Sequence, residues 1–132
     1  MAKTRKHVQI IDDDINIRLY LRTLFQRAGY RVSEVDNPIS VTFRDRSNPP
    51  DLVVLDLNMP GLDGFGVCRE LKKDGAFRAP IVVISGMTEP SHRQAALDAG
   101  ADAFLSKPIE SDALLSRVAG LLGESTGLGP AV

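Results

Sequence analysis

The stretch "LVVLDLNMPGLDGFGVCRELKKDGAFRAPIVVIS", residues 52–85, reads as one strand–helix–strand unit. Its two ends, 52–56 and 81–85, are unbroken apolar runs up to the last residue, a pattern typical of strands buried on both faces of a parallel sheet. Between them "GFGVCRELKKDG" (64–75) has helical periodicity, and Asp63 stands where an N-cap is needed. Two parallel strands joined by a helix predict an α/β fold.

The same alternation continues towards the N-terminus. "HVQII" (7–11) predicts a first strand, and "INIRLYLRTLFQRAG" (15–29) predicts a helix that ends at its glycine. "YRVSEV" (30–35) alternates like a half-buried or edge strand. The first helix has one apolar face, made of Ile17, Leu21, Leu24, Phe25 and Ala28.

Three further elements follow towards the C-terminus. A helix is predicted over "PSHRQAALDAG" (90–100), a fifth strand over "AFLSK" (103–107), and a last helix over "SDALLSRVAGLLG" (111–123). A fifth helix lies within "PISVTFRDRSNPP" (38–50), where the two prolines end it abruptly. Its β-branched residues make this helix the weakest signal of the five.

Together these segments predict a doubly wound sheet of five parallel strands with five helices and right-handed crossovers. The folded domain spans residues 7–122, which is large enough to form a hydrophobic core. Residues 1–6 and 123–132 are short, polar or rich in glycine and proline, and are expected to be flexible tails.

Composition narrows the class of protein. Hydrophobic residues make up 43% and charged residues 25%, as in a soluble globular domain, and the net charge of −1 gives no basic field for nucleic acid. The sequence has no apolar run of membrane-spanning length and no signal peptide. Cys68 stands alone, which fits a small core residue in a reducing cytoplasm.

Chemically active side chains follow the predicted strands at their carboxyl ends. They are Asp12, Asp13, Asp56, Ser85 and Lys107. In open parallel sheets this edge binds ligands, so the fold is expected to gather these residues into one pocket. Two carboxylates about 4 Å apart repel by on the order of 4 kcal/mol at an effective dielectric near 20, so the acidic cluster needs a reason. The cluster is explained if the carboxylates bind a divalent cation and Lys107 faces an anion beside that cation.

Four motifs resemble the receiver domain of two-component response regulators, in order and at matching spacing. They are "IIDDD" (10–14), "LVVLDLNMPGLDGFGV" (52–67), "VVISG" (82–86) and "GADAFLSKPI" (100–109). The resemblance covers residues 7–122 and is to the chemotaxis-regulator type. It implies a flavodoxin-like sheet with strand order 2-1-3-4-5.

The resemblance also implies a role for each matched residue. Asp56 corresponds to the aspartate that accepts a phosphoryl group. Asp13 corresponds to a direct Mg²⁺ ligand, Asp12 to one acting largely through water, and the backbone carbonyl of Asn58 to a third contribution. Asp56 itself completes the protein ligands, and Mn²⁺ can replace Mg²⁺.

Other matched residues contact the phosphoryl group or respond to it. Lys107 pairs with the phosphoryl group, while the Ser85 hydroxyl and the Gly86 amide turn towards it on activation. Phe104 corresponds to the aromatic switch, although a permanently buried core residue is nearly as good a reading. Structural roles fall to Pro108, commonly joined by a cis bond, and to the loop beneath the site with Met59, Pro60, Gly61 and Gly64.

A protein with these roles is a signalling switch, and its only catalysis is its own phosphoryl transfer and slow dephosphorylation. The expected donor is a histidine kinase or a histidine phosphotransfer protein. The expected output surface comprises 90–100, 103–107 and 111–123, and it contacts a downstream protein rather than nucleic acid or membrane. A monomer or a phosphorylation-dependent dimer fits this mode of action.

Alternative functions are less well supported. A phosphatase that forms an aspartyl phosphate wants a second aspartate two residues after the nucleophile, where this chain has Asn58. A flavodoxin-like nucleotide binder is disfavoured because the sequence contains neither G-x-x-x-x-G-K-[ST] nor G-x-G-x-x-G. A phosphorylation-independent binding module is disfavoured because every expected site residue is present.

The output of the switch stays open. Ten residues after Leu122 are too few for a DNA-binding domain, so the sequence is either a single-domain regulator or a receiver from a larger regulator or hybrid kinase. Ala103 stands where many DNA-binding relatives carry a second acid, which is a weak sign against that branch.

Overall fold

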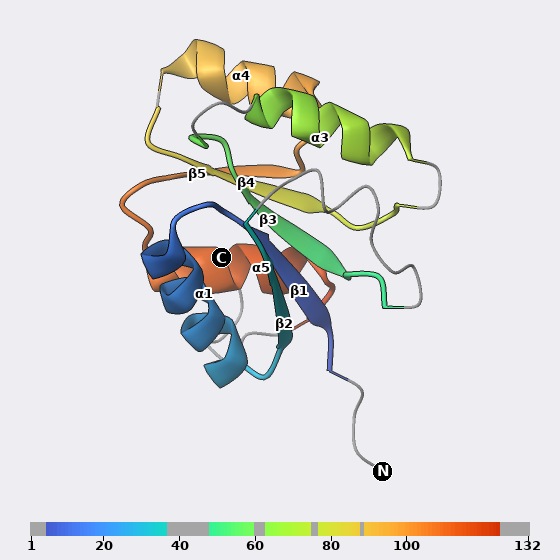
Figure 1. The fold of residues 1–132 in the computed structure, drawn as a ribbon, viewed down its shortest axis with the longest axis vertical. Helices are drawn as coiled ribbons and strands as arrows, with labels where there is room; N and C mark the ends of the chain where they lie inside the picture. The colour runs from blue at the N-terminus through green and yellow to red at the C-terminus, as the bar shows by residue number, and fades with distance from the viewer. Residues whose placement is uncertain (1–4, 37–47, 60–62, 75–76, 88, 125–132) are drawn as a thin grey trace.

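The computed structural model describes residues 5–36, 48–59, 63–74, 77–87 and 89–124. Within these ranges five strands alternate with four helices (Figure 1). The strands are β1 (His7–Ile11), β2 (Arg31–Val35), β3 (Leu52–Asp56), β4 (Ile81–Ser85) and β5 (Ala103–Ser106). The helices are α1 (Ile15–Arg27), α3 (Gly64–Lys73), α4 (Pro90–Asp98) and α5 (Ser111–Leu121).

The strands form one parallel sheet in the order β2-β1-β3-β4-β5, which confirms the predicted order. The chain moves outwards from β1 to β2 and then returns to β3 on the other side of β1. Strand order therefore reverses between β1 and β3, and the carboxyl ends of these two strands flank the crevice where doubly wound sheets bind ligands.

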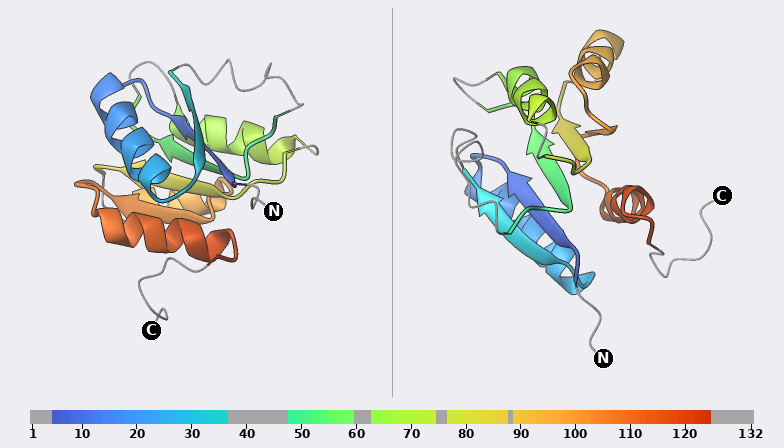
Figure 2. Two further views of the ribbon diagram at one scale, coloured as in Figure 1. Left: turned by 90° about the horizontal axis from the view of Figure 1, so that it is seen from below. Right: turned by 90° about the vertical axis from the view of Figure 1, so that its right-hand side faces the viewer.

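The helices cover both faces of the sheet, with α3 and α4 on one side and α1 and α5 on the other (Figures 1 and 2). Each face has its own hydrophobic core. The core under α1 and α5 includes Val8, Ile10, Leu21, Phe25, Leu114 and Val118. The core under α3 and α4 includes Ile11, Val53, Leu55, Cys68, Leu71 and Phe104. All residues of β1, β3 and β4 are buried, which is why their sequences are almost continuously apolar.

Aspartate side chains fix the starts of two helices, and one of them, Asp63, was predicted from the sequence. Asp14 caps α1, where its Oδ1 accepts from the backbone N–H of Asn16 at 2.8 Å. Asp63 caps α3 and accepts from the N–H of Phe65 at 3.1 Å. Each cap satisfies a backbone donor that has no partner within the helix, so the two βα turns beside the crevice are held firmly.

Two details of the sequence interpretation need correction or qualification. Ala28 was expected on the apolar face of the first helix, but it is the C-cap of α1 and is exposed, because the helix ends one residue earlier. Most of the segment 38–50, in which a helix was expected, lies outside the described residues, which resume at residue 48.

Cys68 is buried, and burial raises the pKa of its thiol to about 11. The thiol is therefore neutral at physiological pH, which confirms the reading of this residue as part of the core. None of the helices in the described ranges combines the length and the apolar character needed to cross a bilayer.

Candidate functional site

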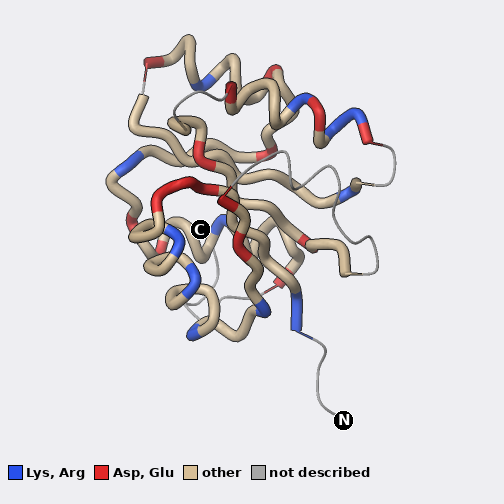
Figure 3. The backbone as a smooth tube through the Cα atoms, viewed as in Figure 1, with Lys and Arg blue, Asp and Glu red and all other residues tan. Residues whose placement is uncertain are grey.

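Three carboxylates meet at the carboxyl ends of β1 and β3. Asp12 directly follows β1 and is 2% exposed, and Asp56 ends β3 and is 4% exposed, whereas Asp13 is exposed. One oxygen from each lies within 4.8 Å of the others. Figure 3 shows the acidic run between β1 and α1 as a continuous red segment. The fold thus brings together acids that are 43 or 44 positions apart in the sequence.

This cluster carries unbalanced negative charge. Burial is the largest influence on Asp12 and raises the pKa of its carboxyl from 3.8 to about 6. A hydrogen bond from the N–H of Asp14 at 2.9 Å opposes this rise, and the charge of Asp56 adds to it. A site in which one buried carboxylate raises the pKa of another is a site where a bound cation would stabilise both.

The donor set fits a hard divalent cation. It consists of carboxylate oxygens only, and the exposed Asp13 opens it to solvent. Mg²⁺ prefers oxygen ligands and usually keeps several waters, and Mn²⁺ takes the same ligands. Asn58 stands two residues after Asp56 and donates its backbone N–H to Oδ1 of Asp56 at 3.0 Å, so it adjoins the cluster.

Lys107 reaches the cluster from the end of β5. Its Nζ lies 3.1 Å from Oδ1 of Asp56, and its backbone N–H donates to the carbonyl of Ser85 at 2.8 Å. The following bond, Lys107–Pro108, is cis, as the motif resemblance implied. The ammonium group therefore stands beside Asp56, where it can partly balance the acids and meet an incoming anion.

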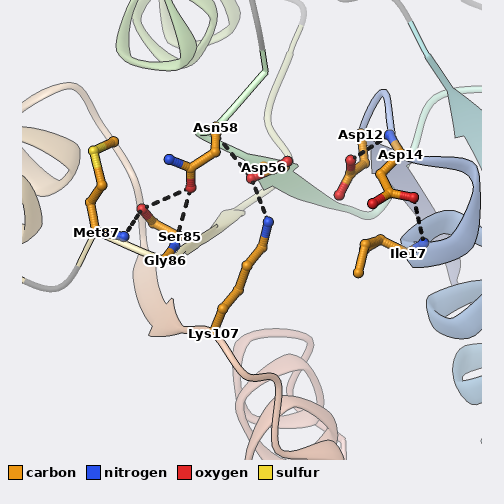
Figure 4. Close-up of polar contacts among 9 residues, drawn as sticks. All are labelled: Asp12, Asp14, Ile17, Asp56, Asn58, Ser85, Gly86, Met87 and Lys107. Atoms are coloured by element: carbon orange, nitrogen blue, oxygen red, sulfur yellow. Dashed lines mark hydrogen bonds and ion pairs between the residues drawn. The ribbon is translucent and has the colours of Figure 1, made fainter.

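The end of β4 contributes a second set of hydrogen-bond donors. The Ser85 hydroxyl donates to Oδ1 of Asn58 at 3.2 Å, and the Gly86 N–H donates to the same oxygen at 3.1 Å. The N–H of Met87 donates to the Ser85 hydroxyl at 3.0 Å. Figure 4 shows Asn58 between this group and Asp56, with Lys107 reaching Asp56 from below.

Arg18 is a residue of the site that the sequence interpretation missed. Its Nη1 donates to the backbone carbonyl of Asp12 at 2.7 Å, and its Nε lies 3.4 Å from Oε1 of Glu34 in β2. The sequence feature that could have indicated this role is the position of Arg18, one helical turn after the cap Asp14. Its contacts, however, depend on how α1 packs against β2, which local spacing does not reveal.

The remaining predicted residues lie around this pocket. Phe104 is 4% exposed in the core under α4, and the guanidinium carbon of Arg93 lies 5.5 Å from its ring centroid. Gly64 packs so tightly against Leu57 that an added Cβ would lie 2.7 Å from the Leu57 side chain. Pro60 and Gly61 lie outside the described residues.

Comparisons with known proteins point to one family. The family model of the response regulator receiver domain matches residues 8–119. The response regulator MprA of Mycobacterium sp. (strain KMS) is 40% identical over 115 residues, covering 87% of this chain and 50% of that protein. This chain therefore spans about half the length of that curated relative.

Solved structures show the same fold. The signal receiver domain of a response regulator from Bermanella marisrubri superposes with a TM-score of 0.81 at 32% identity, covering 90% of this chain and 99% of that one. The signal receiver domain of a signal transduction histidine kinase from Syntrophus aciditrophicus superposes with a TM-score of 0.80 at 27% identity, covering 96% and 95%.

Proposed function

The chain belongs to the family of response regulator receiver domains, and we propose that it accepts a phosphoryl group on Asp56. The donor is a phosphohistidine on a histidine kinase or a histidine phosphotransfer protein. The observation that carries the proposal is the position of Asp56, which is buried between the carboxylates of Asp12 and Asp13 and the ammonium of Lys107. A carboxylate between a cation-binding cluster and a fixed positive charge is well placed to attack phosphorus.

The transfer is an in-line displacement. A carboxylate oxygen of Asp56 forms a bond to phosphorus, the bond between phosphorus and the imidazole nitrogen of the donor breaks, and the electron pair stays on the imidazole. Lys107 moves from the Asp56 carboxylate to a phosphoryl oxygen. Asp12 and Asp13 would hold the cation, together with Asp56 and the carbonyl of Asn58. When bound, Mg²⁺ would supply positive charge against the phosphoryl oxygens. Hydrolysis by water later resets the site.

The response passes through the end of β4. The added group carries about −1.5 to −2 charges, by analogy with other phosphorylated side chains, and attracts the Ser85 hydroxyl and the Gly86 N–H. Their movement shifts the loop before α4 and changes the packing around Phe104. The surface formed by α4, β5 and α5 thereby shifts between two pre-existing arrangements, and a downstream protein binds one of them.

The context of this switch has two candidate forms. The stretch of MprA that matches this chain is 50% of that response regulator, and the receiver from Syntrophus aciditrophicus belongs to a histidine kinase. These relatives support a receiver within a larger regulator or hybrid kinase, alongside the single-domain regulator. In each form the receiver itself acts by protein contact.

Acetyl phosphate with Mg²⁺ tests the central proposal directly. We expect one alkali-labile phosphate per chain on the wild type and none on Asp56→Asn. Asp63→Asn is a matched control, because it changes an exposed helix cap and asparagine also caps helices. It should take the label as the wild type does, and a wild type without label would refute the proposal.

A further inference from the structure

The side chain of Asn58 accepts two hydrogen bonds on one oxygen. Its Oδ1 lies 3.2 Å from the Ser85 hydroxyl and 3.1 Å from the Gly86 nitrogen (Figure 4). These are the two donors that the proposed function assigns to the phosphoryl group. The amide oxygen of Asn58 therefore binds the donors that a phosphoryl oxygen would need.

Neither the Ser85 hydroxyl nor the Gly86 N–H can donate fully to both the Asn58 amide oxygen and a phosphoryl oxygen. A serine hydroxyl carries a single proton, and a backbone amide carries one as well. The N–H of Met87 donates to the Ser85 oxygen, and the hydroxyl donates its own proton towards Asn58, because Oδ1 of Asn58 can only accept. Both protons are thus committed to Asn58 in this state, and the loop that begins at Gly86 is tied to the loop after β3.

We propose that the Asn58 side chain is an internal competitor of the phosphoryl group at the end of β4. This inference rests on the proposed function and adds a role for the side chain of Asn58 to the one proposed for its backbone carbonyl. Asn58 is here a positioning residue, since it acts through Ser85 and Gly86. Phosphorylation has to displace its amide oxygen before Ser85 and Gly86 can donate to the phosphoryl group.

Two features make this contact exchangeable. Asn58 is exposed, so its amide can turn to water after release without being left unpaired in the interior. Hydrogen bonds to a charged oxygen are roughly twice as strong as those to a neutral amide, so the phosphoryl group wins the exchange. Asn58 therefore sets the threshold for activation and does not block it.

Beryllofluoride, used with Mg²⁺ as a noncovalent mimic of the phosphoryl group, tests the competition. It is titrated into ¹⁵N-labelled wild type and Asn58→Ala while the Gly86 and Met87 amide signals are followed. We expect Asn58→Ala to bind about 3- to 10-fold more tightly, the range that follows from one net hydrogen bond. Its two amide signals should already be shifted before the mimic is added.

A matched control is Asn48→Ala. Asn48 is another exposed asparagine whose Oδ1 accepts a side-chain hydrogen bond, from Arg31 at 3.3 Å, and Arg31 begins β2 at the opposite edge of the sheet. This variant should bind beryllofluoride with the affinity of the wild type. Unchanged or weaker binding by Asn58→Ala would overturn the inference.

Ser85→Ala separates competition from a merely structural role. It removes one of the two donors, so the gain from Asn58→Ala should be smaller in this background than in the wild type. A structural role for Asn58 predicts a loss of similar size in both backgrounds, which would refute the competition. A wild type that binds no beryllofluoride and takes no phosphate would instead refute the proposed function itself.

Discussion

The Nζ of Lys107 lies 3.1 Å from Oδ1 of Asp56, although 51 positions separate the two residues in the chain. Asp56 ends β3 and Lys107 follows β5, with β4 between them in the sheet. The contact therefore forms only when all three strands are in register. The charge balance of the acidic cluster thus depends on the correct pairing of β3, β4 and β5.

Lys107→Met should slow the labelling of Asp56 by acetyl phosphate by about 100-fold. The substitution keeps much of the side-chain length but removes the positive charge that meets the phosphoryl oxygens, and losing one such group typically has an effect of this size. The measurement is the initial rate of phosphate incorporation at saturating Mg²⁺. Lys72→Met is the control, because Lys72 pairs with Asp102 at 2.9 Å on another part of the surface. Equal rates for the two variants would contradict the role of Lys107.

The stability of the metal-free protein should fall as pH rises from about 4 to 6. Asp12 releases its proton near 3.8 in the unfolded chain but near 6 in the folded protein, so the folded state binds more protons in this window. The loss attributable to Asp12 is on the order of 2–3 kcal/mol by linkage. Urea denaturation in a chelator at pH 4 and pH 7.5 measures it.

Asp12→Asn should remove this part of the pH dependence. Asparagine retains an oxygen that can accept from the N–H of Asp14, but it has no charge to bury. We expect the variant to match the wild type near pH 4 and to exceed its stability above pH 6 when no metal is present. If the stability of the two proteins changed with pH in the same way, Asp12 would not be the source of the pH dependence.

Mg²⁺ should offset that difference in stability at pH 7.5. A ligand that binds only the folded state at about 100 times its dissociation constant adds about 2.7 kcal/mol of stability. The wild type should gain this stability, whereas Asp12→Asn should lose most of the gain. Asp14→Asn tests specificity, because Asp14 is a helix cap in the same acidic run and asparagine also caps. Loss of the Mg²⁺ effect in Asp14→Asn would indicate a diffuse charge effect and not a site.

The sheet and the position of the site could be predicted because burial leaves a direct trace in the sequence. The runs 52–56 and 81–85 are apolar since both faces of β3 and β4 are covered by helices. The polar residue that ends each run lies at the carboxyl edge of the sheet, where the acidic cluster forms. Strand order came from the motif resemblance, and the sheet confirms it.

The orientations of individual polar side chains could not be predicted. Asn58 was assigned only a backbone role, because its side-chain contacts form with the β4 end, 27 positions away. Arg18 was missed since its partner Glu34 lies on β2. Ala28 was placed in the core because helical periodicity does not show where a helix ends. The contacts of Asn58 and Arg18 depend on how separate elements approach one another.

Gly64→Ala should destabilise the protein by about 1–3 kcal/mol, the range seen when a methyl group is forced into a packed site. The new Cβ would lie 2.7 Å from Cδ2 and 2.8 Å from the Cα of Leu57, and the backbone cannot move away cheaply. Since Leu57 follows Asp56, the strain should also weaken Mg²⁺ binding. Thermal unfolding with and without Mg²⁺ measures both effects.

Gly120→Ala in α5 is the control, because its Cβ meets nothing within 4 Å and alanine stabilises a helix by about 0.5–1 kcal/mol relative to glycine. A Gly64→Ala protein as stable as Gly120→Ala would mean that α3 can begin without this close contact with Leu57.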